Sequence, residues 1–503
     1  MTDAALNAAA EEPTDEPQAT LARSVSSRRA VADVGAQIGG QVVNLALGIV
    51  ATIVLVRALG STRYGEWATI LALIELVGLV GNFGVETVAV RFAAQDPERA
   101  GSWVGAATSL RVLVSLPVLA IFLVVIAVIA GSDEMLVAGL VLSVLYLTAA
   151  LSTLRIVFRL HVRNHITAGF AIANSVLWTG LIVAIAAFGG GLVPFALAFA
   201  GTAVVIQGAT AIVALRTMEV RWRGVRHLWP RLFRVGLAVG IAGTLTFAYA
   251  RIDQLLIYEL APKASEVGVY AAMCKILENA GFVPIAVMTT LFPIMAGLYP
   301  GEPERLRRIM QAAIDYLAMI SLGALALTVA AAGPIVELLF GPSYAEGATI
   351  LPILFAAFIP ICIGNVAGNM VIATDLQRRY IWFAAIGLLI NAPLNLLLIP
   401  SYGIEASAWI TLATEVAVVS LTLAAVLRRI EMRLAPGRIV LATLAAAVAG
   451  LGVWGLRQAG LGAIPLIAAM TLAYPALLIA LRALDLGELR TLIRRRRVPE
   501  AAA

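Results

Sequence analysis

The chain has 503 residues, of which 61% are hydrophobic and only 13% are charged, and it carries a formal net charge of +6. Soluble domains are about a quarter charged, so this composition excludes an ordinary soluble protein. Apolar runs of about twenty residues, without the alternating pattern of a membrane β-barrel, predict an all-α polytopic membrane protein.

The chain begins with a polar and acidic segment that precedes any apolar stretch. We expect residues 1–30 to be a disordered cytoplasmic tail, and no cleavable signal peptide is visible there. Apolar segments long enough to cross a membrane as helices then follow one another to the end of the chain. We predict about fourteen transmembrane helices, at 36–58, 64–88, 104–130, 135–154, 166–188, 192–215, 234–258, 266–297, 310–333, 347–373, 379–399, 404–427, 438–456 and 461–482.

The longest basic connection comes after the sixth predicted helix and suggests a division into halves. A weak internal similarity supports this division, because residues 59–65, before the second helix, resemble residues 261–270, before the eighth. Two parallel repeats of this kind place a substrate site between them. The predicted parts are an N-lobe at 31–215, a basic linker at 216–233, a C-lobe at 234–430, a helix pair at 431–484 and a basic cytoplasmic tail at 485–503.

Basic residues alternate along the chain. Most of the 36 lysines and arginines fall in every second gap between predicted helices, from Arg23 in the N-terminal tail to the arginines that end at Arg497. Basic loops resist translocation, so the rich side is expected to be cytoplasmic, with both termini on that side. The arginines lie between spans and have no interleaved aromatic residues, which argues against binding of nucleic acid.

The sequence gives no sign of a disulfide framework, a metal site or a nucleotide-binding loop. Cys274 and Cys362 fall inside predicted helices and suggest neither a disulfide framework nor a metal site. Lys263 and Lys275 are the only lysines, and neither follows the glycine that a phosphate-binding nucleotide loop requires. We therefore expect no cofactor and no bound metal. Energy for transport then has to come from an ion gradient of H⁺ or Na⁺, from the membrane potential or from the substrate gradient itself.

Four stretches of the chain are similar to a known family. They are residues 57–66 with Gly81-Asn-Phe-Gly84, Arg251-Ile-Asp253 with residues 266–276, residues 338–345, and residues 395–408. Together they resemble the polysaccharide flippases of the superfamily that also contains multidrug exporters and lipid II flippases. One departure is Glu405, which stands where the family often has a small residue.

The resemblance implies a function. It implies a two-lobed bundle in the bacterial inner membrane that works by alternating access. The implied substrate is an undecaprenyl-diphosphate-linked oligosaccharide, which is flipped from the cytoplasmic to the outer leaflet. The flipped product is used for capsule, O-antigen or exopolysaccharide assembly. The partners that we expect are this lipid-linked oligosaccharide, membrane lipids and polysaccharide polymerising enzymes, with the protein itself a monomer.

Other functions of similar membrane proteins have to be weighed. A lipid II flippase for peptidoglycan and a cation-coupled drug antiporter of the same superfamily remain the alternatives. A polysaccharide polymerase or ligase is disfavoured, because the predicted outer loops are short and contain no histidine. We therefore do not expect an enzyme.

Cations within the predicted spans are the candidates for substrate binding. A diphosphate crossing a medium of low dielectric requires compensating positive charge. The resemblance implies that helices 1, 2, 7 and 8 line the central cavity, which nominates Lys275, Arg251 and Arg57 for the diphosphate.

Carboxylates in the same helices are candidates for ion coupling or charge balance, namely Asp253, Glu75 and Glu278. Intramembrane charges are costly and need a partner or an aqueous cavity. Lys275 with Glu278, and Arg251 with Asp253, can equally be buried pairs that fix helix packing. We interpret Arg111 and Glu415 as snorkelling or packing residues.

Overall fold

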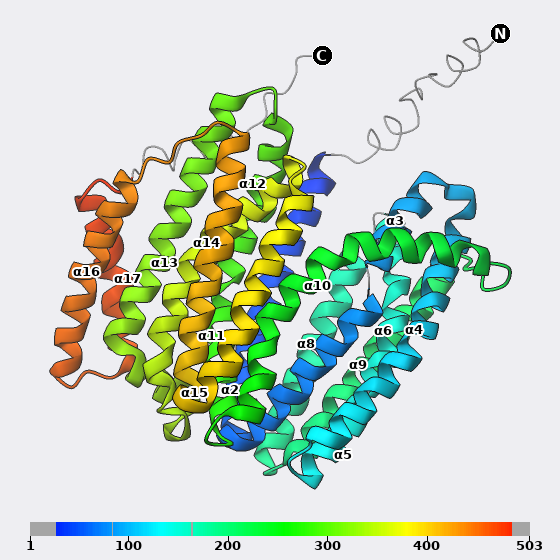
Figure 1. Ribbon diagram of the computed structural model, residues 1–503, viewed down its shortest axis with the longest axis horizontal. Helices are drawn as coiled ribbons and strands as arrows, with labels where there is room; N and C mark the ends of the chain where they lie inside the picture. Colours follow the sequence, from blue (N-terminus) through cyan, green and yellow to red (C-terminus); the bar gives the residue numbers. More distant parts are fainter. Residues whose placement is uncertain (1–26, 83, 162–163, 485–503) are drawn as a thin grey trace.

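The computed structural model describes residues 27–82, 84–161 and 164–484, and within these ranges every regular element is a helix (Figure 1). This confirms the predicted all-α membrane fold. Short 3₁₀ turns occur at η1 (Pro97–Arg99), η2 (Ser152–Arg155), η3 (Arg226–Leu228) and η4 (Pro342–Tyr344). The α-helices are α2 (Ser27–Asn82), α3 (Val85–Gln95), α4 (Ala100–Ile129), α5 (Asp133–Leu142), α6 (Val144–Leu151), α7 (Ile156–Leu160), α8 (Asn164–Ala187), α9 (Leu192–Thr217), α10 (Trp229–Leu260), α11 (Glu266–Ala280), α12 (Phe282–Leu298), α13 (Pro303–Phe340), α14 (Gly347–Ala373), α15 (Gln377–Arg429), α16 (Gly437–Gln458) and α17 (Ala463–Ala480).

Eleven helical stretches in the described residues are long and apolar enough to cross a membrane. Two of them are too long for one crossing, because about twenty residues suffice, whereas α2 has 56 residues and α15 has 53. Each contains one glycine with positive φ, Gly60 at 69° and Gly403 at 56°, where the helix breaks. Each therefore supplies two spans. Helix α10 is not among the eleven stretches, but its 32 residues are long enough for one crossing, so the described helices can supply the fourteen crossings that the sequence predicts.

The boundaries of several helices differ from the prediction. The segment predicted at 64–88 ends at Asn82, and α3 starts anew after Gly84, whose φ is +67°. The segment predicted at 135–154 is divided among α5, α6 and η2. Helix α13 extends past the predicted 310–333 at both ends, because its polar first turns precede the apolar stretch and its last turns continue through Pro334 to Phe340. Apolar length reports how much chain crosses the membrane, but not where a helix continues into water.

The two predicted tails lie mostly outside the described residues. Residues 1–26 and 485–503 are not described, and α2 begins at Ser27, inside the segment predicted as a disordered tail.

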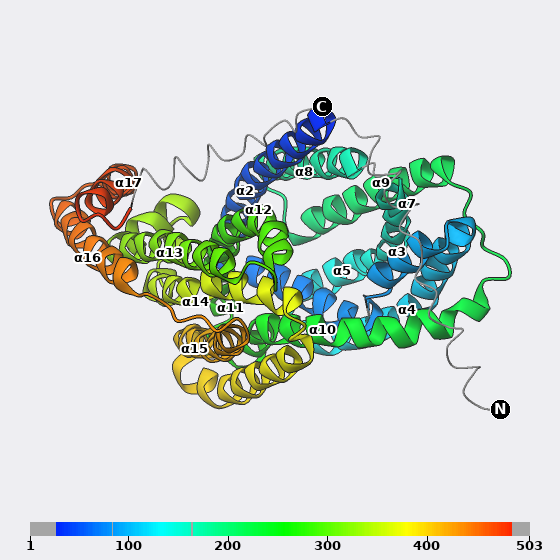
Figure 2. The same ribbon diagram turned by 90° about the horizontal axis from the view of Figure 1, so that it is seen from above.

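The helices form two groups. In Figures 1 and 2, the first group contains α3 to α9 and the second contains α11 to α17. Helices α2 and α10 join the groups, since α2 contacts both α8 and α11, and α10 contacts α3 and α15. Side chains on α2, α10 and α11 therefore lie where the two groups meet.

Large apolar side chains are exposed on the outside of both groups. Val128 on α4 is 80% exposed, Leu389 on α15 is 72% exposed and Leu472 on α17 is 74% exposed. Broad apolar exposure of this kind would be unfavourable in water, whereas it matches a hydrocarbon environment. The exposed surface thus agrees with a multi-pass membrane protein.

Helices α2 and α11 approach each other closely at a pair of glycines. A Cβ atom added to Gly268 on α11 would collide with the Ser61 carbonyl oxygen and the Gly65 nitrogen of α2. A Cβ atom at Gly65 would likewise meet Val267 and Gly268. Small residues allow helix backbones to pack this closely in membranes. The two internally similar segments of the sequence therefore contact each other at these glycines.

Candidate functional site

Four of the nominated residues form one ionic cluster between the two groups. Glu75 comes from α2, Arg251 from α10, and Lys275 and Glu278 from α11. Lys275 and Glu278 are three residues apart on one helix and therefore share a face. We call these four residues the ionic cluster.

Arg251 is the centre of the ionic cluster. Its Nε atom lies 2.8 Å from Oε2 of Glu75, and its Nη1 atom donates to Oε1 of Glu278 at 2.6 Å. The second oxygen of Glu278 accepts from Nζ of Lys275 at 2.7 Å. The Arg251 side chain is 16% exposed, whereas those of its partners are more open, at 41% for Glu75 and 36% for Glu278. The arrangement is a chain of alternating charges that links α2 to α10 and α11.

Asp253 lies near the ionic cluster but is held by other partners. It is 5% exposed, and its carboxylate accepts from the Tyr270 hydroxyl at 2.5 Å and from the backbone N–H of Gln254 at 2.8 Å. The Tyr270 oxygen also lies 3.1 Å from the Thr411 hydroxyl on α15. Among the described residues, no ion pair joins Asp253 to Arg251. The contacts of Asp253 therefore tie α10, α11 and α15 together.

A cavity of about 340 Å³ adjoins the ionic cluster. Charged and polar groups meet an apolar wall there, which is the usual character of a site for an amphiphilic ligand. Glu415, which we interpreted as a packing or snorkelling residue, also lines this cavity. The lining includes Arg251, Asp253, Gln254, Tyr270, Cys274, Glu278, Asn391, Thr411, Thr414 and Glu415.

Arg57, the third nominated cation, lies apart from the ionic cluster. Its Nε atom donates to the Leu339 carbonyl at 2.9 Å, and its Nη2 atom donates to the Leu338 carbonyl. It lines a different cavity, of about 1000 Å³, together with Glu337 and Arg457. The structure therefore brings together two of the three cations nominated for the diphosphate.

Arg111 has a structural environment that explains its burial. Its guanidinium is 10% exposed, donates to the Thr153 hydroxyl at 3.0 Å and lies 3.9 Å from the Glu86 carboxylate. It therefore connects α4 to η2 and α3 within the first group, rather than snorkelling to an interface.

The sequence interpretation missed some polar residues of the site. Gln254, Tyr270 and Thr414 line the cavity, and within the described part of the chain the buried Thr414 hydroxyl has no hydrogen-bond partner. Tyr270 was visible as part of the motif at 266–276, but nothing in its spacing showed that its hydroxyl meets Asp253. Such contacts join separate helices and have no signature in one sequence.

Comparisons with known proteins agree with this architecture. A family model described as "Polysaccharide biosynthesis protein" matches residues 30–298. A search of curated proteins gives no match to the chain.

Several solved structures share the fold. The lipid II flippase MurJ in an inward closed conformation is 11% identical, with a TM-score of 0.73 that covers 91% of this chain and 99% of MurJ. An inward-facing multidrug MATE transporter of the MOP superfamily is 15% identical, with a TM-score of 0.59 over 77% of this chain and 94% of that one. A MATE transporter of Vibrio cholerae is 16% identical, with a TM-score of 0.54 over 78% and 94% of the two chains.

Proposed function

The chain belongs to the polysaccharide biosynthesis protein family, a flippase family of the MOP superfamily, and from this we propose that it moves a lipid-linked oligosaccharide across the membrane. The substrate that we propose is an undecaprenyl-diphosphate-linked oligosaccharide, carried from the cytoplasmic to the outer leaflet of the bacterial inner membrane. The product would serve capsule, O-antigen or exopolysaccharide assembly. The observation that most supports the proposal, beside the family, is the ionic cluster between the two groups of helices.

The ionic cluster suits an anionic headgroup because it holds two cations. Arg251 and Lys275 are already neutralised by carboxylates, so an entering diphosphate has to compete with Glu75 or Glu278 for them. Arginine binds phosphate and carboxylate oxygens with the same fork of N–H donors, which makes such an exchange chemically simple. We propose that the diphosphate replaces one carboxylate at Arg251.

The same exchange gives a route to coupling and to movement. A carboxylate released from Arg251 in a medium of low dielectric gains from taking up H⁺ or pairing with Na⁺. Glu75 belongs to α2 and Arg251 to α10. Release of Glu75 from Arg251 therefore also breaks an ionic link between these two helices. Substrate binding can thereby favour a different arrangement of the two groups, as alternating access requires.

Deletion of the gene followed by analysis of lipid-linked glycans tests the function. We expect surface polysaccharide to be lost while undecaprenyl-diphosphate oligosaccharide accumulates on the cytoplasmic leaflet. Lys275→Ala, at normal membrane abundance, should fail to restore export. Arg99→Ala is the matched control, since the Arg99 side chain is 72% exposed and pairs only with Asp96 in the described structure.

Other outcomes of the deletion would select the alternatives. Accumulation of lipid II with cell lysis would indicate a peptidoglycan precursor flippase. Unchanged glycan lipids together with new drug sensitivity would indicate a drug antiporter. Normal polymer output from Lys275→Ala would remove that residue from the proposed site without rejecting the flippase.

A further inference from the structure

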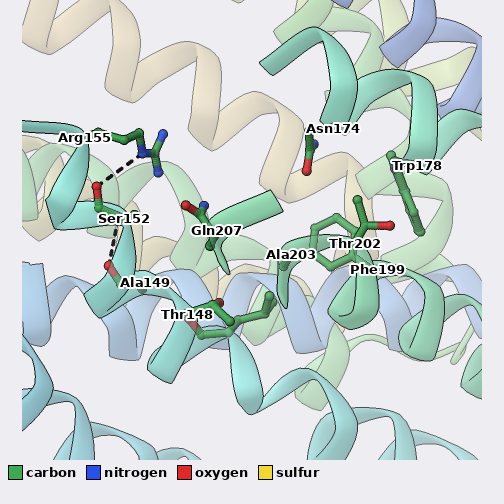
Figure 3. Close-up of a pocket in the computed structure, with 11 residues that line it drawn as sticks. Thr148, Ala149, Ser152, Arg155, Asn174, Trp178, Phe199, Thr202, Ala203 and Gln207 are labelled. Atoms are coloured by element: carbon green, nitrogen blue, oxygen red, sulfur yellow. Dashed lines mark hydrogen bonds between the residues drawn. The ribbon is translucent and has the colours of Figure 1, made fainter. Parts of the chain in front are cut away.

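A second polar cavity lies inside the first group of helices, away from the residues of the ionic cluster (Figure 3). It has a volume of about 300 Å³ and is formed by α6, η2, α8 and α9. We call it the first-group cavity. Its lining includes Thr148, Ser152, Arg155, Asn174, Trp178, Phe199, Thr202 and Gln207.

Arg155 gives the first-group cavity a positive charge. Its Nε atom donates to the backbone carbonyl of Ser152, three residues earlier, at 3.3 Å. This hydrogen bond holds the Nε end of the guanidinium in place. In the described part of the chain, no carboxylate lies within ion-pair distance of Arg155. It differs in this from Arg251, whose guanidinium contacts two carboxylates. The remaining N–H donors of Arg155 are thus available to an anion.

Neutral polar groups surround the same space. Figure 3 shows the side chains of Asn174 and Gln207 reaching into the cavity from α8 and α9. Thr202 is only 3% exposed, and its buried hydroxyl oxygen has no hydrogen-bond partner among the described residues. A buried hydroxyl left unpaired is unfavourable, so a group that bonds to Thr202 would gain free energy by binding there.

Aromatic rings form one wall of the cavity. Trp178 and Phe199 have ring centroids 4.8 Å apart in an edge-to-face arrangement. Trp67 of α2 stacks on Trp178 at 6.1 Å and holds it in place. A fixed aromatic wall offers an apolar surface for the C–H face of a sugar ring, while amides and hydroxyls can bond to the sugar hydroxyls.

From these groups we infer that the first-group cavity binds a sugar ring that carries an anionic group, an inference that rests on the function proposed above. Arg155 would bind the anionic group, Asn174, Thr202 and Gln207 the ring hydroxyls, and Trp178 the apolar face of the ring. In a lipid-linked oligosaccharide, such a ring is a sugar joined to phosphate or a uronic acid unit.

The position of the cavity relative to the ionic cluster is compatible with one extended substrate. Trp67, behind the aromatic wall, and Glu75, in the ionic cluster, are eight residues apart on the same helical segment of α2. Eight residues correspond to a rise of about 12 Å along a helix. An oligosaccharide attached to a diphosphate is long enough to cover this rise.

Ligand-observed NMR on the full chain in lipid nanodiscs tests the cavity. The probes are the 1-phosphates of glucose, galactose, mannose and N-acetylglucosamine, together with glucuronate, free glucose and inorganic phosphate. We expect saturation transfer to the ring protons of at least one anionic sugar, and little transfer to free glucose. Asn174→Ala, Gln207→Ala and Arg155→Gln should each reduce this signal about fivefold or more, as loss of a hydrogen bond to a charged or buried group predicts.

Two controls locate the binding. Ser175→Ala, next to Asn174 but outside the cavity lining, should leave the signal unchanged. Arg99→Ala, at an exposed arginine outside both the first-group cavity and the ionic cluster, should also leave the signal unchanged. Glucuronate distinguishes a carboxylate-bearing ring from a sugar phosphate.

The inference is overturned if no anionic sugar gives a signal, or if the cavity variants bind as well as the unmodified protein. It is also overturned if inorganic phosphate displaces the sugar phosphate at equal concentration, since that would show an anion site without sugar recognition. These experiments measure binding and not export, so the deletion phenotype can fail while sugar binding persists, or the reverse.

Discussion

Arg251 is a largely buried positive charge that pairs with two carboxylates at once. A guanidinium that is 16% exposed in a membrane requires compensation, and Arg251 obtains it from two carboxylates on two different helices. Removing one partner from such an arrangement leaves an uncompensated charge, which is more damaging than losing an exposed pair. The same two contacts that stabilise Arg251 are those that a diphosphate would replace.

Arg251→Ala is expected to lower both stability and export. The variant leaves Glu75 without its cation, and we expect a loss on the order of 1–2 kcal/mol, between values typical of exposed and of buried ion pairs. Arg251→Lys should show a smaller loss of stability, because it keeps the charge but not the planar fork that reaches both carboxylates. Thermal unfolding of the purified protein and surface polysaccharide from complemented deletion cells provide the two measurements.

The exposed arginine Arg99 again supplies the control, and Arg99→Ala should match the unmodified protein in both assays. If Arg251→Ala unfolded at the normal temperature and restored full export, the ionic cluster would have neither a structural nor a transport role.

At the scale of elements, apolar length predicted the spans well, because insertion in a membrane depends mainly on that property. The turn at Gly403 lies between two predicted helices and the break at Gly60 lies between two others, as expected. The interruption before α3 was missed, because the prediction continued the second helix through Gly81, Asn82 and Gly84, and glycine and single polar residues also occur inside membrane helices.

The site was predictable in part for a related physical reason. Charges inside apolar spans are conspicuous, so Glu75, Arg251, Lys275 and Glu278 could be singled out, and they meet in space. Which charges pair depends on how the helices pack. The spacing of Arg251 and Asp253 could not show that Arg251 pairs with Glu75 and Glu278 instead of with Asp253. Amides and hydroxyls of the first-group cavity are tolerated in any membrane helix, which is why the sequence did not reveal them.

The glycine contact between α2 and α11 gives a test at this scale. Gly268→Ala introduces a Cβ atom against the Ser61 carbonyl, a backbone atom that cannot rotate away. We expect the variant to be destabilised by about 1–3 kcal/mol, as is typical of overpacking. The expected measurement is a lower thermal unfolding temperature in detergent, accompanied by lower export because the two groups no longer approach normally.

Gly297→Ala on α12 is the matched control, because in the described structure an added Cβ there meets nothing within 4 Å beyond its own stretch of helix. It should be neutral or slightly stabilising, since alanine favours a helix more than glycine does. Equal unfolding temperatures for the two variants would show that the close approach of α2 and α11 is not important for stability.

At the scale of the whole molecule, the basic linker is fixed to the first group. The Arg221 N–H donates to the Gly101 carbonyl at 3.1 Å, and a Cβ at Gly105 would collide with the Arg221 carbonyl. The first residue of α10 is held to the same group, because the Trp229 Nε1–H donates to the Ser109 hydroxyl at 3.2 Å. The far end of α10 carries Arg251 and contacts α15 of the second group. Relative motion of the two groups therefore has to be accommodated along α10 and α2.

The orientation of the molecule decides the direction of transport, and cysteine labelling tests it. In a background with Cys274→Ala and Cys362→Ala, Gly224→Cys reports on the linker and Phe188→Cys on the loop between α8 and α9. Phe188 is 91% exposed, so its replacement should not disturb packing. Consecutive spans place these two loops on opposite sides, and the basic residues around Gly224 predict the cytoplasmic side for the linker. A membrane-impermeant maleimide added to intact spheroplasts should label Phe188→Cys, and should label Gly224→Cys only after the membrane is permeabilised. The reverse pattern would place both termini outside, and the proposed movement from the cytoplasmic to the outer leaflet would then have to begin at the opposite face of the ionic cluster.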